Sequence, residues 1–369
     1  MKFDKAKLKI GFIKEVNDTR VSLTPEVAKK FKKSGHDLFL ESGAGDLSNF
    51  NNSDYKEYVK VVRYSDLLEK SELLISINPI ELNKINSNFS KKIYLSNFNS
   101  VNKDNYLPVL EKNNIHSFDL GIIPRTTIAQ SMDILSSQAN LSGYKAVIKA
   151  AELLPRMFPM IITAAGSIKP AKVVVLGAGV AGLQAIATAK RLGAIVEASD
   201  PRSAAREEVL SLGARFIEVE GAVEDSSAGG YAVKQTKEYL ERQKKEVSKK
   251  LELADVVIST AQVLGGKSPI LIPKAVVDKM KPGSVIIDLA SASGGNCEMT
   301  QDGKMIIYND IKIVGNSYLS AELSQDSSNL FSNNVYNFLE YIINDNKIVD
   351  NYEDEIFSQC YITKKIKFS

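Results

Sequence analysis

Three glycines with the spacing Gly-x-Gly-x-x-Gly are the strongest chemical signal in this chain. They are Gly177, Gly179 and Gly182, which follow an apolar, β-branched run and open a helical pattern. Asp200 ends the next apolar run, near the spacing of about 20 residues expected in a dinucleotide fingerprint. The pattern predicts a tight turn, close approach of backbone to a pyrophosphate, and phosphate binding at a helix N-terminus. The alternative is a purely structural glycine-rich turn.

Asp200 also bears on which dinucleotide would bind. A carboxylate accepts hydrogen bonds from the adenosine ribose hydroxyls and disfavours a 2′-phosphate, so NAD(H) is preferred over NADP(H). Arg202 and Arg206 leave an alternative open, because either could pair with a 2′-phosphate. For Arg206 we favour a solvated charge near the start of a helix.

Groups that could move a proton are scarce. The chain has two histidines, His36 and His116, and each lies between a helical stretch and a strand, where we expect a polar turn residue. No Cys/His cluster has metal-ligand spacing. A hydroxy-acid dehydrogenase must move a proton as well as a hydride. Hydride transfer directly between two nicotinamides needs no proton, and the sequence is compatible with that reaction.

Two loops could complete a nucleotide site. The segment 124–147 is densely polar and precedes a long helical pattern at a domain boundary; its Arg125 and Asp133 could pair, and its glutamines suit a carboxamide. An ordinary capped loop remains the alternative. The second loop, 220–235, is rich in Gly and Ser and carries Tyr231, so it is either a lid or a surface insertion. The other polar residues of the first loop are Gln130, Ser136, Gln138 and Tyr144.

Composition sets the outer limits. The chain has 369 residues, 44% hydrophobic content and a net charge of +3, which indicates a globular protein without a nucleic-acid partner. Its two cysteines, Cys297 and Cys360, cannot form a disulfide framework, and this favours a cytosolic protein. We expect no signal peptide and no membrane span.

The alternation of strand and helix patterns predicts the α/β class, with two doubly wound Rossmann-like domains. A helix is expected after Thr24 as N-cap and Pro25 at its first position. A long amphipathic stretch after Gly315 is expected to pack back on the first domain and make it discontinuous; the alternative is that it caps the second domain. The expected domains are 1–140 plus 318–369, and 141–317, which is entered through a long helix and has six strands.

Five segments resemble one family, the NAD(H)-binding alpha-1 component (domain I) of proton-translocating NAD(P) transhydrogenase. L-alanine dehydrogenase is the sister family with the same fold. The resemblance spans almost the whole chain. The segments are 14–26, 129–147, 172–194, 229–234 and 280–298.

This resemblance implies an oxidoreductase that binds NAD(H) and transfers hydride directly between NADH and NADP⁺. The NADP(H) would be held by a partner component, and membrane-spanning subunits would couple the transfer to proton translocation. It also implies a homodimer, attached to the cytoplasmic side of the membrane through its partners without insertion of its own.

The resemblance further implies individual site residues. Arg125, Gln130 and Asp133 would surround the nicotinamide, with Ser136 in their network, and these are the residues we assign to catalysis. Tyr231 would lie on a mobile loop over the nucleotide. No metal site is implied. The implied cofactor contacts are Arg125, Thr126, Thr127, Ile128, Gln130, Ser131, Met132, Asp133, Gly177, Gly179, Val180, Ala181, Gly182, Asp200, Pro201, Arg202, Tyr231, Gln243 and Gln262.

Differences separate this chain from both families. Alanine dehydrogenases need a substrate-binding Lys just before a Pro, and a nearby catalytic His; the matching stretches 73–79 and 93–98 contain neither. Arg20 is common to both families. The chain departs from the transhydrogenase pattern at Gln262, at Ala292 and after Gly315.

Overall fold

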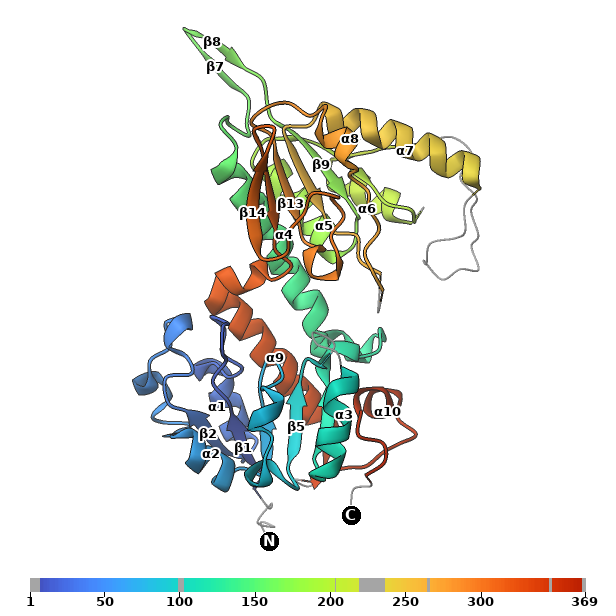
Figure 1. The fold of residues 1–369 in the computed structure, drawn as a ribbon. Helices are drawn as coiled ribbons and strands as arrows, with labels where there is room; N and C mark the ends of the chain where they lie inside the picture. Colours follow the sequence, from blue (N-terminus) through green and yellow to red (C-terminus); the bar gives the residue numbers. More distant parts are fainter. Residues whose placement is uncertain are drawn as a thin grey trace. The chain divides into compact units, whose positions relative to one another are not determined.

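A computed structural model describes residues 7–98, 103–202, 204–218, 236–263, 266–344 and 347–366. The chain divides into two compact units (Figure 1). Unit 1 comprises residues 1–138 and 321–369, and unit 2 comprises residues 139–320. Both ends of the chain therefore build unit 1.

The sheet of unit 1 has six strands in the order β3-β2-β1-β4-β5-β6. All of its pairings are parallel. Its central strands are buried apolar runs, as expected for a sheet covered on both faces. The strands are β1 (Lys9–Phe12), β2 (Asp37–Glu41), β3 (Lys60–Val62), β4 (Leu73–Ile75), β5 (Ile93–Ser96) and β6 (His116–Asp119).

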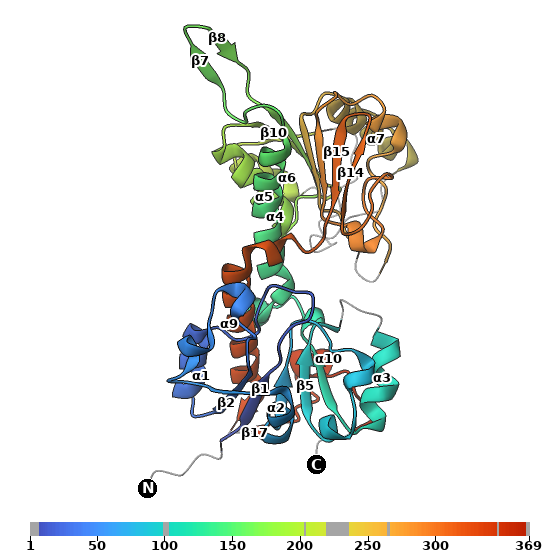
Figure 2. The same ribbon diagram turned by 60° about the vertical axis from the view of Figure 1, so that its left-hand side comes forward.

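Helix α9 (Ser324–Ile342) belongs to unit 1 and shares its core. Its Phe331 and Phe338 are buried in the same cluster as Phe12 of β1. The amphipathic stretch after Gly315 thus supplies core side chains to unit 1 and does not cap unit 2. Figure 2 shows α9 beside the helices and strands formed by the N-terminal segments of the chain.

The other helices of unit 1 surround this sheet. Helix α1 begins with Thr24 as N-cap and Pro25 at its first position, as predicted. The Thr24 hydroxyl does not cap the helix; its oxygen lies 3.3 Å from Oδ1 of Asn329 on α9. The helices are α1 (Pro25–Lys33), α2 (Tyr64–Lys70), α3 (Lys103–Lys112) and α10 (Glu355–Cys360).

The sheet of unit 2 has seven strands in the order β11-β10-β9-β12-β13-β15-β14. The six strands predicted from the sequence are parallel, with Val173 of β9 paired to Val196 of β10 and Val256 of β12. They are β9 (Lys172–Leu176), β10 (Ile195–Ser199), β11 (Arg215–Phe216), β12 (Val256–Ser259), β13 (Val285–Asp288) and β15 (Ile311–Gly315).

The seventh strand, β14 (Lys304–Tyr308), is antiparallel to β15 and lies beside it at the sheet edge (Figure 2). Asn309 and Asp310 join the two strands, with φ of 48° and 59°. Positive φ at both positions is the signature of a tight hairpin turn, which Asn and Asp tolerate. The sequence pattern did not predict this strand, because β14 is half exposed.

Helices and a small hairpin complete unit 2. The hairpin of β7 (Ile161–Thr163) and β8 (Gly166–Ile168) projects from the unit (Figure 1). Helix α4 carries the chain from unit 1 into unit 2, with the boundary between Gln138 and Ala139. The helices are α4 (Ile134–Leu153), α5 (Val180–Arg191), α6 (Ala205–Ser211), α7 (Lys237–Glu252) and α8 (Lys274–Val277).

Candidate nucleotide-binding site

The glycine turn connects β9 to α5, and two of its glycines are required by the fold itself. Gly177 has φ of +95°, a left-handed conformation that side chains disfavour. A Cβ on Gly182 would lie 1.9 Å from the carbonyl oxygen of Gly177, so the start of α5 packs directly against the turn. These two glycines therefore bring strand and helix together.

Gly179 has a different environment. It is the exposed N-cap of α5, and a Cβ there would meet no atom within 4 Å. The first-turn N–H groups of α5 have no partner inside the helix. The turn also follows β9 at the point where strand order reverses between β9 and β12, the usual place for a ligand in such sheets. The turn thus has the open space and the N–H donors that a pyrophosphate requires.

Asp200 lies after β10, and its carboxylate, although buried, is fully engaged. Oδ2 accepts a hydrogen bond from the backbone N–H of Ala178 in the glycine turn, at 2.7 Å. Arg202 donates to Oδ1 through its backbone N–H and Nε, both at 2.9 Å, and to Oδ2 through Nη2 at 3.0 Å. These four bonds use the carboxylate's ordinary acceptor positions. Asp200 therefore orients the glycine turn, and a ribose hydroxyl would have to replace part of the Arg202 pairing.

Asp288, which the sequence patterns did not single out, organises the loop after β13. Its Oδ2 accepts hydrogen bonds from the N–H groups of Asn296 and Cys297 and from the Thr300 hydroxyl. Gly295 has φ of +80°, and a Cβ there would lie 2.8 Å from this oxygen. The Gly-Gly-Asn sequence thus wraps a loop around a buried carboxylate.

Asn296 ties that loop to the end of β12. Its side chain accepts from the N–H of Ala261 at 3.0 Å and donates to the Ala261 carbonyl at 2.8 Å. Gln262, next in the chain, donates from Nε2 to the Leu289 carbonyl at 3.0 Å. The strand ends on one side of the glycine turn are therefore cross-linked by amides.

The remaining predicted contacts of unit 2 are placed as follows. Gln243 is half-buried on α7, and Pro201 is exposed. Val180 is exposed and Ala181 half-buried at the start of α5. Tyr231 lies outside the described residues.

In unit 1, the predicted nicotinamide loop contains a short 3₁₀ segment, η7 (Ile128–Met132). Its inner side chains, Ala129 and Met132, are buried in the core of unit 1. The polar side chains lie on the outside. Arg125, Thr127, Ile128, Gln130 and Ser131 are exposed, and Thr126 and Asp133 are half-buried.

Asp133 caps the helix that follows. Its Oδ1 accepts from the Ser136 N–H at 2.9 Å, and its Oδ2 accepts from the Ser136 hydroxyl at 2.6 Å. This places Ser136 in one network with Asp133. The pairing of Arg125 with Asp133 that the sequence allowed does not form; Arg125 has no ion pair with any residue that the structure describes.

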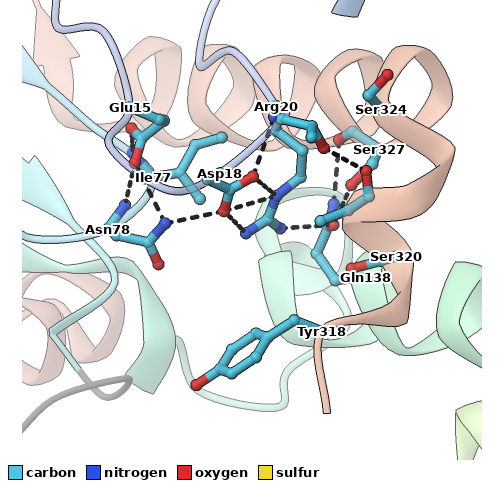
Figure 3. A network of polar contacts seen from close by, with 12 residues as sticks. Glu15, Asp18, Arg20, Ile77, Asn78, Gln138, Tyr318, Ser320, Ser324 and Ser327 are labelled. Atoms are coloured by element: carbon cyan, nitrogen blue, oxygen red, sulfur yellow. Dashed lines mark hydrogen bonds and ion pairs between the residues drawn. The ribbon is translucent and has the colours of Figure 1, made fainter. Parts of the chain in front are cut away.

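The carboxyl ends of β1 and β4, where strand order reverses in unit 1, carry a buried ion pair (Figure 3). Arg20 binds both oxygens of Asp18, with Nη2 2.6 Å from Oδ2, and its Nη1 donates to Gln138 at 2.9 Å. Both side chains of the pair are at most 9% exposed. Burial alone raises the pKa of Asp18, but Arg20 outweighs it and holds that pKa below its ordinary value. The arginine is thus neutralised within unit 1.

Glu15 lies beside this pair, and among the described residues its direct partners are amides (Figure 3). It accepts hydrogen bonds from the N–H groups of Ile77 and Asn78 and from the Asn78 side chain, which also donates to Asp18. Burial raises the pKa of Glu15 to about 7, although the two backbone donors act in the opposite direction. The buried carboxylate is therefore costly to ionise.

Neither histidine is a polar turn residue of the expected kind. His36 does precede β2, but its side chain is buried against Phe31, 6.3 Å between ring centroids. His116 begins β6, and its Nδ1 lies 2.9 Å from the Tyr361 hydroxyl. Burial lowers the pKa of both. They belong to the core of unit 1 and to its packing against the C-terminal segment.

Metal ligands and membrane-spanning helices are both lacking in the described ranges. There, no group of three or more His, Cys, Asp or Glu residues could hold a metal ion. In the same ranges, every helix is too short or too polar to cross a membrane.

The fold and this glycine turn define a two-domain α/β protein of the dinucleotide-binding class. Both domains of the alanine dehydrogenase/PNT family match the chain, the N-terminal domain over residues 11–142 and the C-terminal domain over residues 146–368. The chain therefore belongs to this family. The predicted fold class and family are confirmed.

Individual relatives agree with this assignment. An NAD(P) transhydrogenase subunit alpha from Rhodospirillum rubrum is 38% identical over 97% of this chain and 96% of its own length. A transhydrogenase structure from Sinorhizobium meliloti has a TM-score of 0.87 at 36% identity, covering 96% of this chain and 98% of that one. An L-alanine dehydrogenase structure has a TM-score of 0.74 at 19% identity, covering 95% of this chain and 99% of that one, and shares the fold.

Proposed function

We propose that this chain is the NAD(H)-binding catalytic subunit of a proton-translocating NAD(P) transhydrogenase. The observation that carries the proposal is the glycine turn, in which Gly179 leaves open space at the N-terminus of α5 while Asp200 binds the backbone beside it. The reaction is inferred from relatives named as transhydrogenase alpha subunits over nearly the full chain.

The residues of unit 2 would hold NAD(H) by its backbone-binding turn. The N–H groups of Val180 to Gly182 would donate to the pyrophosphate, and the helix dipole of α5 would favour its charge. Asp200 and Arg202 would contact the adenosine ribose, with Arg202 releasing one carboxylate oxygen. NADH supplies the hydride when bound.

The loop of unit 1 would contact the nicotinamide. Gln130 is exposed and offers both a donor and an acceptor, as a carboxamide requires. The Ser136 hydroxyl orients the Asp133 carboxylate, while Arg125 is left uncommitted within the described part of the chain. None of these groups needs to take up or release a proton when hydride passes between two nicotinamides.

The proposal includes partners. A separate component would bind NADP(H), and membrane-spanning subunits would couple hydride transfer to proton movement. This chain would act as a homodimer, peripheral on the inner face of the cytoplasmic membrane through those subunits.

The buried Arg20–Asp18 pair disfavours the alternative, an alanine-type dehydrogenase acting alone. Such an enzyme needs a cation for the substrate carboxylate and a proton-transfer group. Here the guanidinium is already bound by Asp18 and Gln138, and the neighbouring polar groups are Ser76, Asn78 and Ser96.

The test is reduction of thio-NADP⁺ by NADH, followed at the wavelength where reduced thio-NADP absorbs apart from NADH. This chain is mixed with the NADP(H)-binding component from the same genome. Fast exchange that requires both proteins is expected. NADH binding without exchange, or NADH oxidation by pyruvate and ammonia with this chain alone, would refute the proposal.

A further inference from the structure

The segment η7 is anchored through the carbonyl oxygen of Ser131. Two side chains of α9 donate to that oxygen: Asn334 Nδ2 at 2.8 Å and Asn337 Nδ2 at 3.0 Å. Ser131 directly follows Gln130, so the orientation of this peptide also sets the direction of the Gln130 side chain. A carbonyl with two amide donors has both of its lone pairs used.

Asn334 also reaches the helix after the loop. Its Oδ1 accepts a hydrogen bond from the Ser137 hydroxyl at 2.7 Å. One buried amide thus joins η7 to the first turn of α4, across the Asp133 cap. Rotating the amide would set its oxygen against the Ser131 carbonyl, so the two contacts fix its orientation.

Apolar packing does not fix the loop alone. Ala129 and Met132 enter the same core as Phe331 and Val335 of α9. Apolar contact is non-directional. The segment has few backbone bonds; the N–H of Asp133 lies 3.4 Å from the Gln130 carbonyl. The directional contacts that fix its rotation are therefore those of Asn334 and Asn337.

We propose that Asn334 is a positioning residue for hydride transfer, which holds Gln130 and Asp133 in register through the Ser131 carbonyl and the Ser137 hydroxyl. The inference rests on the proposed function for its kinetic consequence. It does not depend on that function for the mechanical one, which is the stiffness of η7.

Asn334→Ala should fold. Ser131 keeps its bond from Asn337, and Ser137 can donate to the Ile134 carbonyl at 3.1 Å. The loop would lose its link to α4, and small misplacements of a reacting pair cost up to about 100-fold in rate. We expect single-turnover hydride transfer to fall about 10-fold, while the Kd for NADH changes less than about 2-fold, since binding relies mainly on unit 2.

Asn333→Ala is the matched control. Asn333 is the neighbouring residue on α9, and its amide bonds go to Asn329 and Lys30, away from η7. It should reduce stability by a similar amount and leave the transfer rate unchanged. Asn334→Asp should be slower than Asn334→Ala, because a carboxylate oxygen would face the Ser131 carbonyl.

Hydrogen exchange of residues 124–133 in the full chain supplies the readout that does not need the reaction. Asn334→Ala should speed exchange there about 10-fold relative to Asn333→Ala. If wild type transfers hydride and Asn334→Ala matches the control in rate and exchange, the positioning role is wrong while the proposed function stands. If wild type transfers no hydride, the proposed function is wrong, and unchanged exchange in Asn334→Ala would overturn the positioning role separately.

Discussion

Two alanine substitutions in one turn should have opposite consequences. The structure gives Gly182 a role in folding and Gly179 a role in ligand binding. Gly182→Ala would place a Cβ 1.9 Å from the Gly177 carbonyl oxygen, about 1.5 Å closer than the 3.4 Å of ordinary contact. The clash is with backbone, so α5 must move away from β9.

The expected magnitude follows from this overlap. Overpacking a rigid interior costs up to about 3 kcal/mol, which for a unit of this size lowers the Tm by roughly 6–12 °C. Gly179→Ala meets no protein atom, and φ of −76° is allowed for alanine. Its stability should stay within about 1 kcal/mol of wild type. A methyl group on the pyrophosphate side should weaken NADH binding at least about 30-fold, or about 2 kcal/mol.

Thermal melts of the nucleotide-free proteins and NADH titrations by calorimetry separate the two effects. Gly182→Ala melting within about 2 °C of wild type, a margin set by about 1 kcal/mol, would refute the close-packing argument. A Gly179→Ala protein that binds NADH as wild type does would refute the assignment of the turn to the pyrophosphate.

Three further outcomes are expected. Gln130→Asn should slow hydride transfer far more than it weakens NADH binding; equal losses in rate and affinity would count against its role at the nicotinamide. Asp200→Asn should narrow the preference for NADH over NADPH by at least about 10-fold, because Arg202 becomes free to pair with a 2′-phosphate; an unchanged ratio of Kd values contradicts this. The Glu15 pKa of about 7 lies above its ordinary value of 4.5, so the stability tied to its protonated form is full below pH 4.5 and is lost as the pH rises through 7. The free energy of unfolding should fall by up to about 3 kcal/mol over that range in wild type and less in Glu15→Gln, as measured by urea titration; parallel curves would show that Glu15 is not the group responsible.

Local patterns in the sequence were enough for much of the fold. The glycine spacing, the β-branched runs and the Thr24–Pro25 helix start depend on neighbouring residues, so their physical causes can be found within a few positions. The edge strand β14 escaped detection because its residues alternate weakly between exposed and half-buried. Its Asn309–Asp310 turn was the local signal that could have revealed it.

The site depended on contacts that no local pattern contains. Arg20 finds Gln138 across 118 positions, and Asn334 finds the Ser131 carbonyl across 203. Motif spacing identified Asp200 but not its bond to the Ala178 N–H, and it allowed an Arg125–Asp133 pair that the helix cap at Ser136 replaces. The sequence by itself determined which residues could bind a dinucleotide, because turn geometry and strand burial are local properties. Only the tertiary structure decided which polar groups are already satisfied and which remain open, because each hydrogen bond is a choice among partners that folding brings together.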